Sequence, residues 1–377
     1  MKVFFVLDNA FPSNNPSAKR VKCYCKGLNA YGVETEVLTI SHKGNPEESE
    51  GVSFEMIGVG HANNLVSKIY VFLKNLIALK KILINKTDRK DIIYLYSDGI
   101  LNMLLPFVIR KKRKLVKEMC EIPFYGDSIR SKLYRSLYFK TSFKKYDGVV
   151  VISHALREVA ENNKNQSCAI VRIPIIVDVE KYNNRNNNPI SSNVIFHSGS
   201  HTELKDGFLG MVKALGLLKE KYSLDIHFYC TGNEPDNAEY KKQIDKYSLS
   251  PNIHYLGYVT DDELISWQNK SALFIINKYD TVQNKYCFAT KLGEYLASGK
   301  LVIATNVGES NYFLQNQRNA IIIQPGDPQL LCDSINWALN HPNEARTIAN
   351  NGRALAINEF NIKKNGSKLR DFLLALK

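Results

Sequence analysis

The chain has 377 residues, which corresponds to two or three domains of ordinary size, and two is the expected number. Hydrophobic residues make up 44% of the chain and charged residues 23%. These are the proportions of a soluble globular protein, and they exclude a disordered, collagenous or low-complexity chain.

No apolar stretch is long enough to cross a membrane, which takes about 20 residues. The longest, 99–109, has 11 residues and is followed by a basic run. The opening apolar run ends at Asp8, which is typical of a first strand rather than of a secretory signal. The seven cysteines are scattered and form no pair of C-x-x-C motifs. We therefore expect a reduced, cytoplasmic protein without a disulfide framework or a zinc site.

The formal net charge of +13 is concentrated in one part of the chain. Residues 66–145 contain 19 Lys or Arg and 6 Asp or Glu, a difference equal to the whole excess. Apolar and tyrosine side chains alternate with these charges. This pattern fits a helix lying on an anionic membrane, a buried amphipathic helix whose lysines face water, or a nucleic-acid surface. No motif of a nucleic-acid-binding fold accompanies it, so we expect no nucleic-acid partner.

Strands and helices alternate along the first half of the chain, which predicts a doubly wound parallel sheet. The predicted strands are 2–7, 35–40, 92–96, 115–119 and 149–152. The predicted helices are 18–30, 65–84, 134–143 and 155–162. The Asn-rich segment 183–193 has no apolar periodicity and is the predicted linker.

The alternation restarts after the linker. The predicted strands are 194–197, 225–231, 253–256, 273–276 and 301–304, and the predicted helices are 207–219, 238–246, 261–270, 290–296 and 329–339. We therefore expect an α/β protein of two Rossmann-like domains, 1–182 and 194–358, that face a cleft. A C-terminal helix in 359–377 is expected to pack back on the first domain. In such sheets, ligands bind beyond the carboxyl ends of the strands.

The common phosphate-binding fingerprints are missing from this sequence. No G-x-G-x-x-G follows the first strand, and no G-x-x-x-x-G-K-[ST] occurs anywhere in the chain. Their absence argues against hydride transfer to NAD and against P-loop hydrolysis.

The segment 196–207, FHSGSHTELKDG, contains the first candidate phosphate contacts. Gly199 at the strand end lets backbone amides approach a phosphate, and Lys205 adds a cation before the next helix. His197 and His201 lie in the same segment. A loop with Gly and Lys before a helix is common, so this segment alone has little specificity.

A second candidate segment is 286–308, YCFATKLGEYLASGKLVIATNVG. The amides of Phe288, Ala289 and Thr290 at the predicted helix start can bind a diphosphate. Glu294, one turn later, can accept hydrogen bonds from two ribose hydroxyls. A glutamate on a helix is usually a plain surface residue, but the two segments together are far more specific than either one.

The sequence resembles the GT-B retaining glycosyltransferases of family 4 over nearly its full length. The most specific match is K-x-x-E-Y-L-A-S-G-K-x-V-I-A at 291–304, whose glutamate, here Glu294, holds the donor ribose in that family. Further matches lie at 149–159, 178–182 and 253–264. The resemblance implies the two-domain GT-B fold and a nucleotide-sugar donor, most often a UDP-sugar.

The resemblance also implies roles for individual residues. Lys205 and Glu294 are the implied catalytic residues, with Lys205 on the donor diphosphate. Thr231, Gly232 and Tyr258 fall where the family packs the nucleobase. The implied donor-binding residues are Gly199, Ser200, Thr231, Gly232, Tyr258, Phe288, Ala289, Thr290 and Lys291.

Three positions depart from the family's pattern. Tyr286 stands where the signature has its first glutamate, and 200–202, SHT, replace an arginine. The glycine pair that precedes A-E-R-V is also missing before 18–21. Asp8, Glu121 and Tyr286 are the candidate contacts to the acceptor or to the transferred sugar.

The function implied by the resemblance is hexosyl transfer with retention of the anomeric configuration, without metal or cofactor. The departing diphosphate would take the acceptor proton while amides and Lys205 stabilise its charge. The expected acceptor is a glycan or a lipid-linked molecule in surface polysaccharide or glycoconjugate biosynthesis. The basic stretch 66–145 would dock on the anionic inner face of the membrane. Two alternatives stay open, an inactive membrane-associated glycan-binding scaffold and a nucleotide-sugar epimerase of the same architecture.

Overall fold

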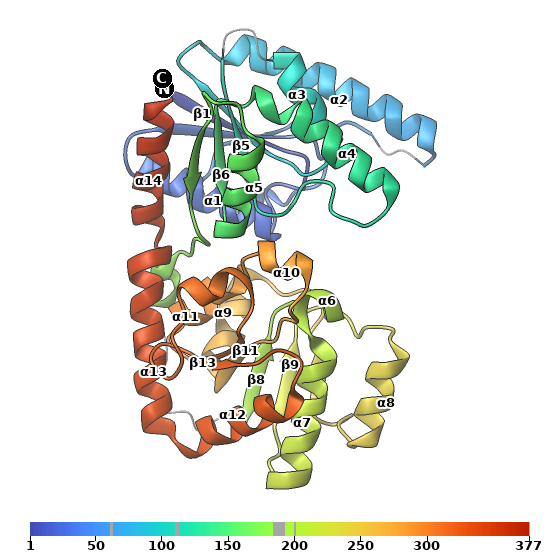
Figure 1. Ribbon diagram of the computed structural model, residues 1–377, viewed down its shortest axis with the longest axis vertical. Coiled ribbons are helices and arrows are strands. Elements are labelled where there is room, and N and C mark those ends of the chain that lie inside the picture. The colour runs from blue at the N-terminus through green and yellow to red at the C-terminus, as the bar shows by residue number, and fades with distance from the viewer. Residues whose placement is uncertain (61–62, 110–112, 184–192, 200, 377) are drawn as a thin grey trace. The chain divides into compact units, whose positions relative to one another are not determined.

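The computed structural model describes residues 1–60, 63–109, 113–183, 193–199 and 201–376. The chain divides into two units that we describe separately (Figure 1). Unit 1 contains Met1–Ile176 and Ile362–Lys377, and unit 2 contains Val177–Asn361. The predicted linker 183–193 lies almost wholly outside the described residues. Within the described ranges, no helix has the length and hydropathy needed to cross a membrane.

Unit 1 is built on a seven-stranded sheet with the order β3-β2-β1-β4-β5-β6-β7, and every neighbouring pair is parallel. The strands are β1 (Lys2–Leu7), β2 (Glu34–Thr39), β3 (Phe54–Met56), β4 (Ile92–Tyr96), β5 (Lys114–Met119), β6 (Gly148–Val151) and β7 (Ala169–Arg172). The strand order reverses between β1 and β4, so the sheet is doubly wound, as predicted.

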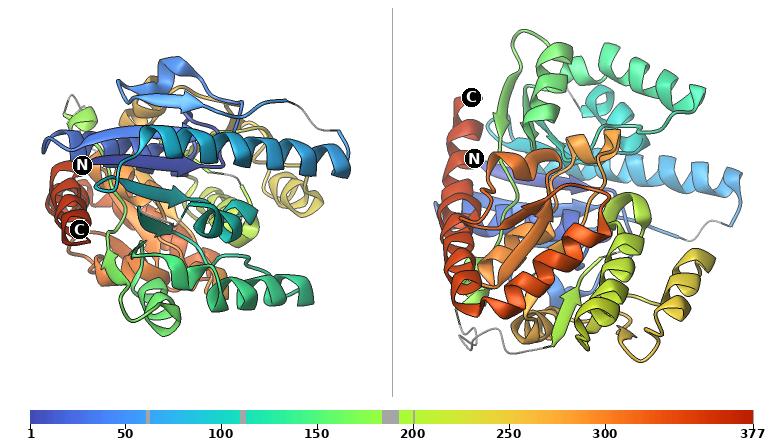
Figure 2. Two further views of the ribbon diagram at one scale, coloured as in Figure 1. Left: turned by 90° about the horizontal axis from the view of Figure 1, so that it is seen from above. Right: turned by 60° about the horizontal axis from the view of Figure 1, so that its bottom comes forward.

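Six α-helices surround this sheet within the described residues. They are α1 (Pro16–Asn29), α2 (Leu65–Lys86), α3 (Ile100–Ile109), α4 (Ile129–Lys140), α5 (His154–Asn163) and α14 (Ile362–Ala375). Polar caps fix several of their starts: the Asn15 side chain accepts from the Ala18 amide, and the Asn64 side chain accepts from the Ser67 amide. Helices α2 and α3 lie against each other, as the view from above shows (Figure 2).

One face of the unit 1 sheet is covered by α1 and α14. Val3, Phe5 and Leu7 of β1 pack into a core with side chains of both helices, while Phe4 and Val6 are buried on the opposite face. The two helices touch at a pair of glycines: a Cβ on Gly27 would lie 2.9 Å from the Gly366 Cα. Any larger residue at either position would push the helices apart.

A buried ion pair links three elements of unit 1. The Arg20 Nε of α1 donates to the Glu118 Oε1 of β5 at 2.9 Å, and both side chains are buried. The other guanidinium nitrogens donate to the carbonyls of Ile173 and Pro174, just after β7. Because the donors and acceptors are matched, the pair ties α1 to the carboxyl edge of the sheet.

Unit 2 contains two three-stranded parallel sheets, β10-β9-β8 and β11-β12-β13. Their strands are β8 (Val194–His197), β9 (His227–Cys230), β10 (Ile253–Tyr255), β11 (Leu273–Ile276), β12 (Leu301–Thr305) and β13 (Ile321–Ile323). The helices are α6 (Glu203–Asp206), α7 (Phe208–Tyr222), α8 (Ala238–Lys246), α9 (Asp261–Lys270), α10 (Val282–Tyr286), α11 (Lys291–Ala297), α12 (Pro328–Asn340) and α13 (Pro342–Leu355).

Side-chain hydroxyls bridge the seam between β8 and β11, the neighbouring strands of the two sheets. The buried Ser271 hydroxyl accepts from the Phe196 amide at 3.0 Å and donates to the Leu273 carbonyl at 2.6 Å. The Tyr295 hydroxyl accepts from the Ser198 amide at 3.0 Å. One direct backbone bond also crosses the seam, from the Ala272 amide to the Val194 carbonyl at 2.8 Å.

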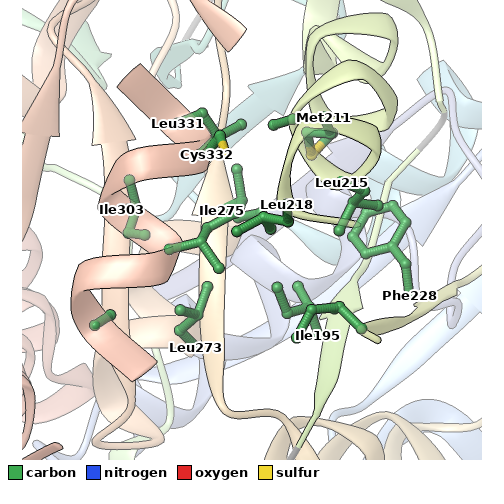
Figure 3. Close-up of a cluster of buried hydrophobic side chains, with 14 of the residues drawn as sticks. Ile195, Met211, Leu215, Leu218, Phe228, Leu273, Ile275, Ile303, Leu331 and Cys332 are labelled. Atoms are coloured by element: carbon green, nitrogen blue, oxygen red, sulfur yellow. The ribbon is translucent and has the colours of Figure 1, made fainter. Parts of the chain in front are cut away.

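The core of unit 2 lies between the strands and the helices α7 and α12 (Figure 3). Strand residues such as Ile195, Phe228 and Ile275 meet Leu215 and Leu331 from these two helices. This packing leaves the carboxyl ends of the strands and their loops free to form a site.

Candidate active site

The loops at the carboxyl ends of β8, β9 and β10 meet in unit 2. The Gly199 amide after β8 donates to the Thr231 Oγ1 after β9 at 3.2 Å. Gly232 and Gly257, which follow β9 and β10, exchange two backbone hydrogen bonds of 2.6 and 3.0 Å. Three segments far apart in the sequence thus form one surface at the edge where ligands bind in such sheets.

Two other predicted donor-binding residues are Tyr258 and Ser200. Tyr258 follows Gly257 directly, and its side chain is 72% exposed. Ser200 lies outside the described residues.

A charged cluster surrounds the Cα of Gly199. The Lys291 Nζ, from the first residue of α11, lies 2.5 Å from the Asp206 Oδ1 of α6. The His197 Nε2 lies 4.0 Å from the same carboxylate oxygen. A Cβ on Gly199 would be 2.6 Å from the His197 Nε2, 2.8 Å from the Lys291 Nζ and 2.9 Å from the Asp206 Oδ2. Any larger residue at this position would have to displace these three polar groups, which point at the same space.

Burial and mutual attraction set the charges in this cluster. Burial by itself would raise the pKa of Asp206, but the Lys291 ammonium, together with His197 and Lys278, holds that pKa well below its usual range. Burial, reinforced by the Lys291 charge, lowers the pKa of His197 well below its usual value. Burial also lowers the pKa of His201. At neutral pH, Asp206 is therefore ionised and both imidazoles are neutral.

Lys205, the predicted diphosphate ligand, lies on α6 with an exposed side chain. Its backbone carbonyl accepts from the Lys278 Nζ at 3.1 Å, and the Asn284 Oδ1 accepts from the same ammonium at 3.2 Å. Burial lowers the pKa of Lys278. Lys205, Lys278 and Lys291 thus place three cations around the loop that follows β8.

The residues predicted around α11 have different environments. Phe288, in the loop that leads into α11, is buried and its ring stacks on Phe313. Ala289 and Thr290 complete that loop. Within α11, the Glu294 Oε2 accepts from the Gln268 Nε2 at 3.5 Å. Gln268 is fully buried, and no described residue bonds to its Oε1.

The candidate acceptor or sugar contacts are divided between the two units. Tyr286 ends α10 in unit 2, whereas Asp8 and Glu121 follow β1 and β5 in unit 1. The Ser97 hydroxyl donates to Asp8, but burial has the larger effect and raises the pKa of Asp8. The buried Lys117 Nζ donates to the Ser97 carbonyl at 2.5 Å.

Sequence reasoning missed Asp206 and Lys278. Asp206 follows the predicted Lys205 directly, so the K-D-G triplet was the available signal. Lys278 comes two residues after β11, where only the three-dimensional arrangement shows its proximity to Lys205. Among the described residues, no three His, Cys, Asp or Glu side chains are grouped as metal ligands.

Residues 178–355, most of unit 2, match the family model described as glycosyl transferases group 1. Solved structures match over the whole chain. A glycosyltransferase from Rickettsia africae ESF-5 aligns with a TM-score of 0.74 and 18% identity, covering 100% of this chain and 98% of that one. The chain has the GT-B glycosyltransferase fold.

Two other GT-B structures are equally similar. Anabaena Alr3699/HepE, in complex with UDP and glucose, aligns with a TM-score of 0.75 and 16% identity, covering 99% of both chains. Sucrose-phosphate synthase from Thermosynechococcus elongatus aligns with a TM-score of 0.74 and 14% identity, covering 100% of this chain and 98% of that one. A search among curated proteins finds no match.

Proposed function

We propose that this chain is a retaining glycosyltransferase that moves a hexosyl group from a nucleotide-sugar, most often a UDP-sugar, to a glycan or lipid-linked acceptor. The observation that carries the proposal is the cluster at Gly199, where the Lys291 ammonium approaches the carboxyl end of β8 and Lys278 binds the Lys205 carbonyl on the neighbouring helix α6. The family match of 178–355 and the UDP complex of the Anabaena neighbour support a nucleotide-diphosphate donor.

In this proposal, the chemistry is mainly electrostatic. Charge grows on the diphosphate as the bond to the sugar breaks, and cations fixed near the phosphates stabilise that charge. Lys205 is exposed and can move onto the diphosphate, while Lys278 and Lys291 are held by hydrogen bonds. The departing phosphate oxygen takes the acceptor proton, so the reaction needs neither a protein nucleophile nor a metal.

Glu294 is proposed to accept hydrogen bonds from the two hydroxyls of the donor ribose. Its neighbour Gln268 supports this role, because the buried amide orients the carboxylate from within the protein. Asp8, Glu121 and Tyr286 are proposed as contacts to the acceptor or to the transferred sugar.

Alanine substitutions test the two proposed catalytic residues. Glu294→Ala and Lys205→Ala are each expected to lower the transfer rate by about tenfold or more, because a charged hydrogen bond contributes about 1.5–3 kcal/mol. The assay is release of UDP from UDP-hexoses, with Lys285→Ala, an exposed residue of α10, as the matched control. Wild-type rates in both variants would remove these residues from the mechanism.

Nucleotide release, combined with analysis of the sugar products without an acceptor, separates the two alternative functions. An inactive glycan-binding scaffold would release no nucleotide from any UDP-, GDP- or ADP-hexose. An epimerase would convert the donor without a second substrate and yield an epimeric sugar. For a glycosyltransferase, we expect nucleotide release, transfer of the sugar to an added acceptor and no epimeric sugar.

The second part of the proposal concerns the basic stretch 66–145, which we propose docks unit 1 on an anionic membrane surface. Large apolar side chains are exposed on three helices of this stretch. They are Leu65, Val66, Ile69, Tyr70, Leu73, Ile77 and Ile84 on α2, Ile100, Leu104 and Phe107 on α3, and Ile129, Leu133, Tyr134 and Leu137 on α4. Exposed basic residues interrupt them, including Lys68, Lys74, Lys80 and Lys81 on α2 and Arg130 and Lys132 on α4. Arg110, Lys111 and Lys112 lie outside the described residues.

This surface suits an anionic membrane because apolar side chains enter the interface while each nearby Lys or Arg adds about 1 kcal/mol. We expect the purified protein to co-sediment with anionic liposomes at low salt and to be released by high salt. Ile77→Glu with Leu133→Glu should abolish binding, whereas Leu330→Glu, an exposed leucine of unit 2, should leave it unchanged. No binding at low salt, or equal binding by all variants, would refute membrane docking but not glycosyl transfer.

A further inference from the structure

The groups around Gly199 cancel one another's charge in the nucleotide-free protein. Lys291 is paired with Asp206 at 2.5 Å, and their side chains are only 17% and 8% exposed. The third member, His197, is 2% exposed and neutral at pH 7. The cluster therefore carries no net charge, although it lies where a diphosphate with two negative charges is proposed to bind.

The His197 ring is placed to change this balance. Its Nε2 lies 4.0 Å from the Asp206 Oδ1, and no described residue forms a hydrogen bond with either ring nitrogen. A buried imidazole without a partner is costly to maintain, because its polar atoms have lost their hydrogen bonds to water. A small shift of the Asp206 side chain would therefore bring its carboxylate, which is paired with Lys291, into hydrogen-bond distance of the His197 ring.

We propose that donor binding exchanges the ion pairs of this cluster: the donor diphosphate takes the Lys291 ammonium, and Asp206 pairs with His197, which takes up one proton from solvent. The proton from solvent forms an N–H bond at the His197 Nε2, and no other covalent bond forms or breaks. The charge of the cluster rises from zero to one positive charge when the diphosphate arrives, and the proton returns to solvent when the nucleotide leaves. Lys291 is then a direct diphosphate ligand, and Asp206 and His197 are positioning residues.

The charged and titratable groups facing His197 fit this exchange. Asp206 of α6 favours the protonated ring, while Lys291 of α11 and His201 of the adjacent loop oppose it. Phe208 of α7 and Phe228 of β9 provide the apolar remainder of the environment. Once the diphosphate neutralises Lys291, the strongest opposing charge is compensated, and Asp206 is released to stabilise the imidazolium.

Calorimetry of donor binding tests the exchange, which rests on the proposed function. UDP-glucose is the probe, since its diphosphate does not titrate near neutral pH. Titrations at pH 7.5 in buffers of different ionisation enthalpy give the number of protons taken up. We expect a net uptake approaching one proton per UDP-glucose, with an affinity that falls by up to about tenfold per pH unit as the pH rises.

Three variants assign the proton. His197→Phe, whose ring suits the aromatic surroundings, and Asp206→Asn should both abolish the uptake and flatten the pH dependence of binding. His341→Phe, an exposed histidine of the same unit, should keep both. Lys291→Met should weaken UDP-glucose binding by about tenfold or more, and Lys291→Arg should restore part of it.

The outcomes distinguish this inference from the proposed function. Binding of UDP-glucose without proton uptake, or with uptake that persists in His197→Phe, would overturn the exchange and leave the glycosyltransferase proposal standing. A folded protein that binds neither UDP-glucose nor UDP would overturn both the UDP-sugar donor and the exchange.

Discussion

A single buried histidine makes the stability of the nucleotide-free protein depend on pH. The pKa of His197 is lowered by burial in the folded protein, whereas in the unfolded chain it returns to its ordinary value near 6.5. Below that value, the unfolded chain binds a proton that the folded protein does not, so stability is fully present above about pH 6.5 and is lost as the pH falls.

We therefore expect the free energy of unfolding to fall by up to about 1.4 kcal/mol per pH unit below pH 6.5 from this group alone. Urea unfolding of wild-type protein and of His197→Phe between pH 7.5 and 5.5 measures the difference. The variant should lose less stability over this range than the wild type. Parallel curves for the two proteins would show that His197 does not titrate on unfolding.

At the residue scale, part of the site could be predicted from the sequence. Gly199, Thr231 and Gly232 come together in space, because the carboxyl ends of adjacent parallel strands share one edge. The pairing of Lys291 with Asp206 could not be predicted, since it joins residues 85 positions apart through the fold. Periodicity and spacing give the element on which a residue lies but not the partner of its side chain.

At the scale of elements, the β8–β11 seam is the least usual feature of unit 2. Ser271→Ala would leave the buried Phe196 amide without its hydrogen bond, which costs about 1–3 kcal/mol. Chemical denaturation measures the loss, and Ser266→Ala, on the exposed side of α9, should change stability by about 0.5 kcal/mol or less. An equally small effect of Ser271→Ala would mean that the seam relaxes or that water replaces the hydroxyl.

Most strands were predictable because they are apolar runs buried on both faces, as in β1, β4 and β11. The predicted helix 329–339 corresponds to α12, whose start is fixed by Asp327, because the Asp327 side chain accepts from the Gln329 and Leu330 amides. The predicted helix 134–143 was placed too late: α4 begins after its N-cap Ser128, a signal that the apolar spacing concealed. Helix α3 was missed because Pro106 lies inside it, and β3 and β13 have only three residues each.

At the scale of the whole molecule, the predicted α/β class and GT-B fold are confirmed. The sequence also led us to expect a C-terminal helix on the first domain, but it did not indicate which residues make that contact. The chain leaves unit 1 after Ile176 and returns to it at Ile362. The returning helix α14 packs along α1 through the paired glycines. This contact could not be predicted from the local sequence, because Gly27 and Gly366 are far apart in the chain and each is needed only where it meets the other.

The most direct test of the central claim, retaining transfer from a nucleotide-sugar, is time-resolved proton NMR of UDP-glucose incubated with the purified protein. Water serves as the acceptor, and EDTA is present because the proposed chemistry uses no metal. We predict that α-glucose, with the configuration of the donor, appears first and that Glu294→Ala slows its appearance by about tenfold or more. Appearance of β-glucose first, or no turnover of any UDP-, GDP- or ADP-hexose by the folded protein, would contradict it.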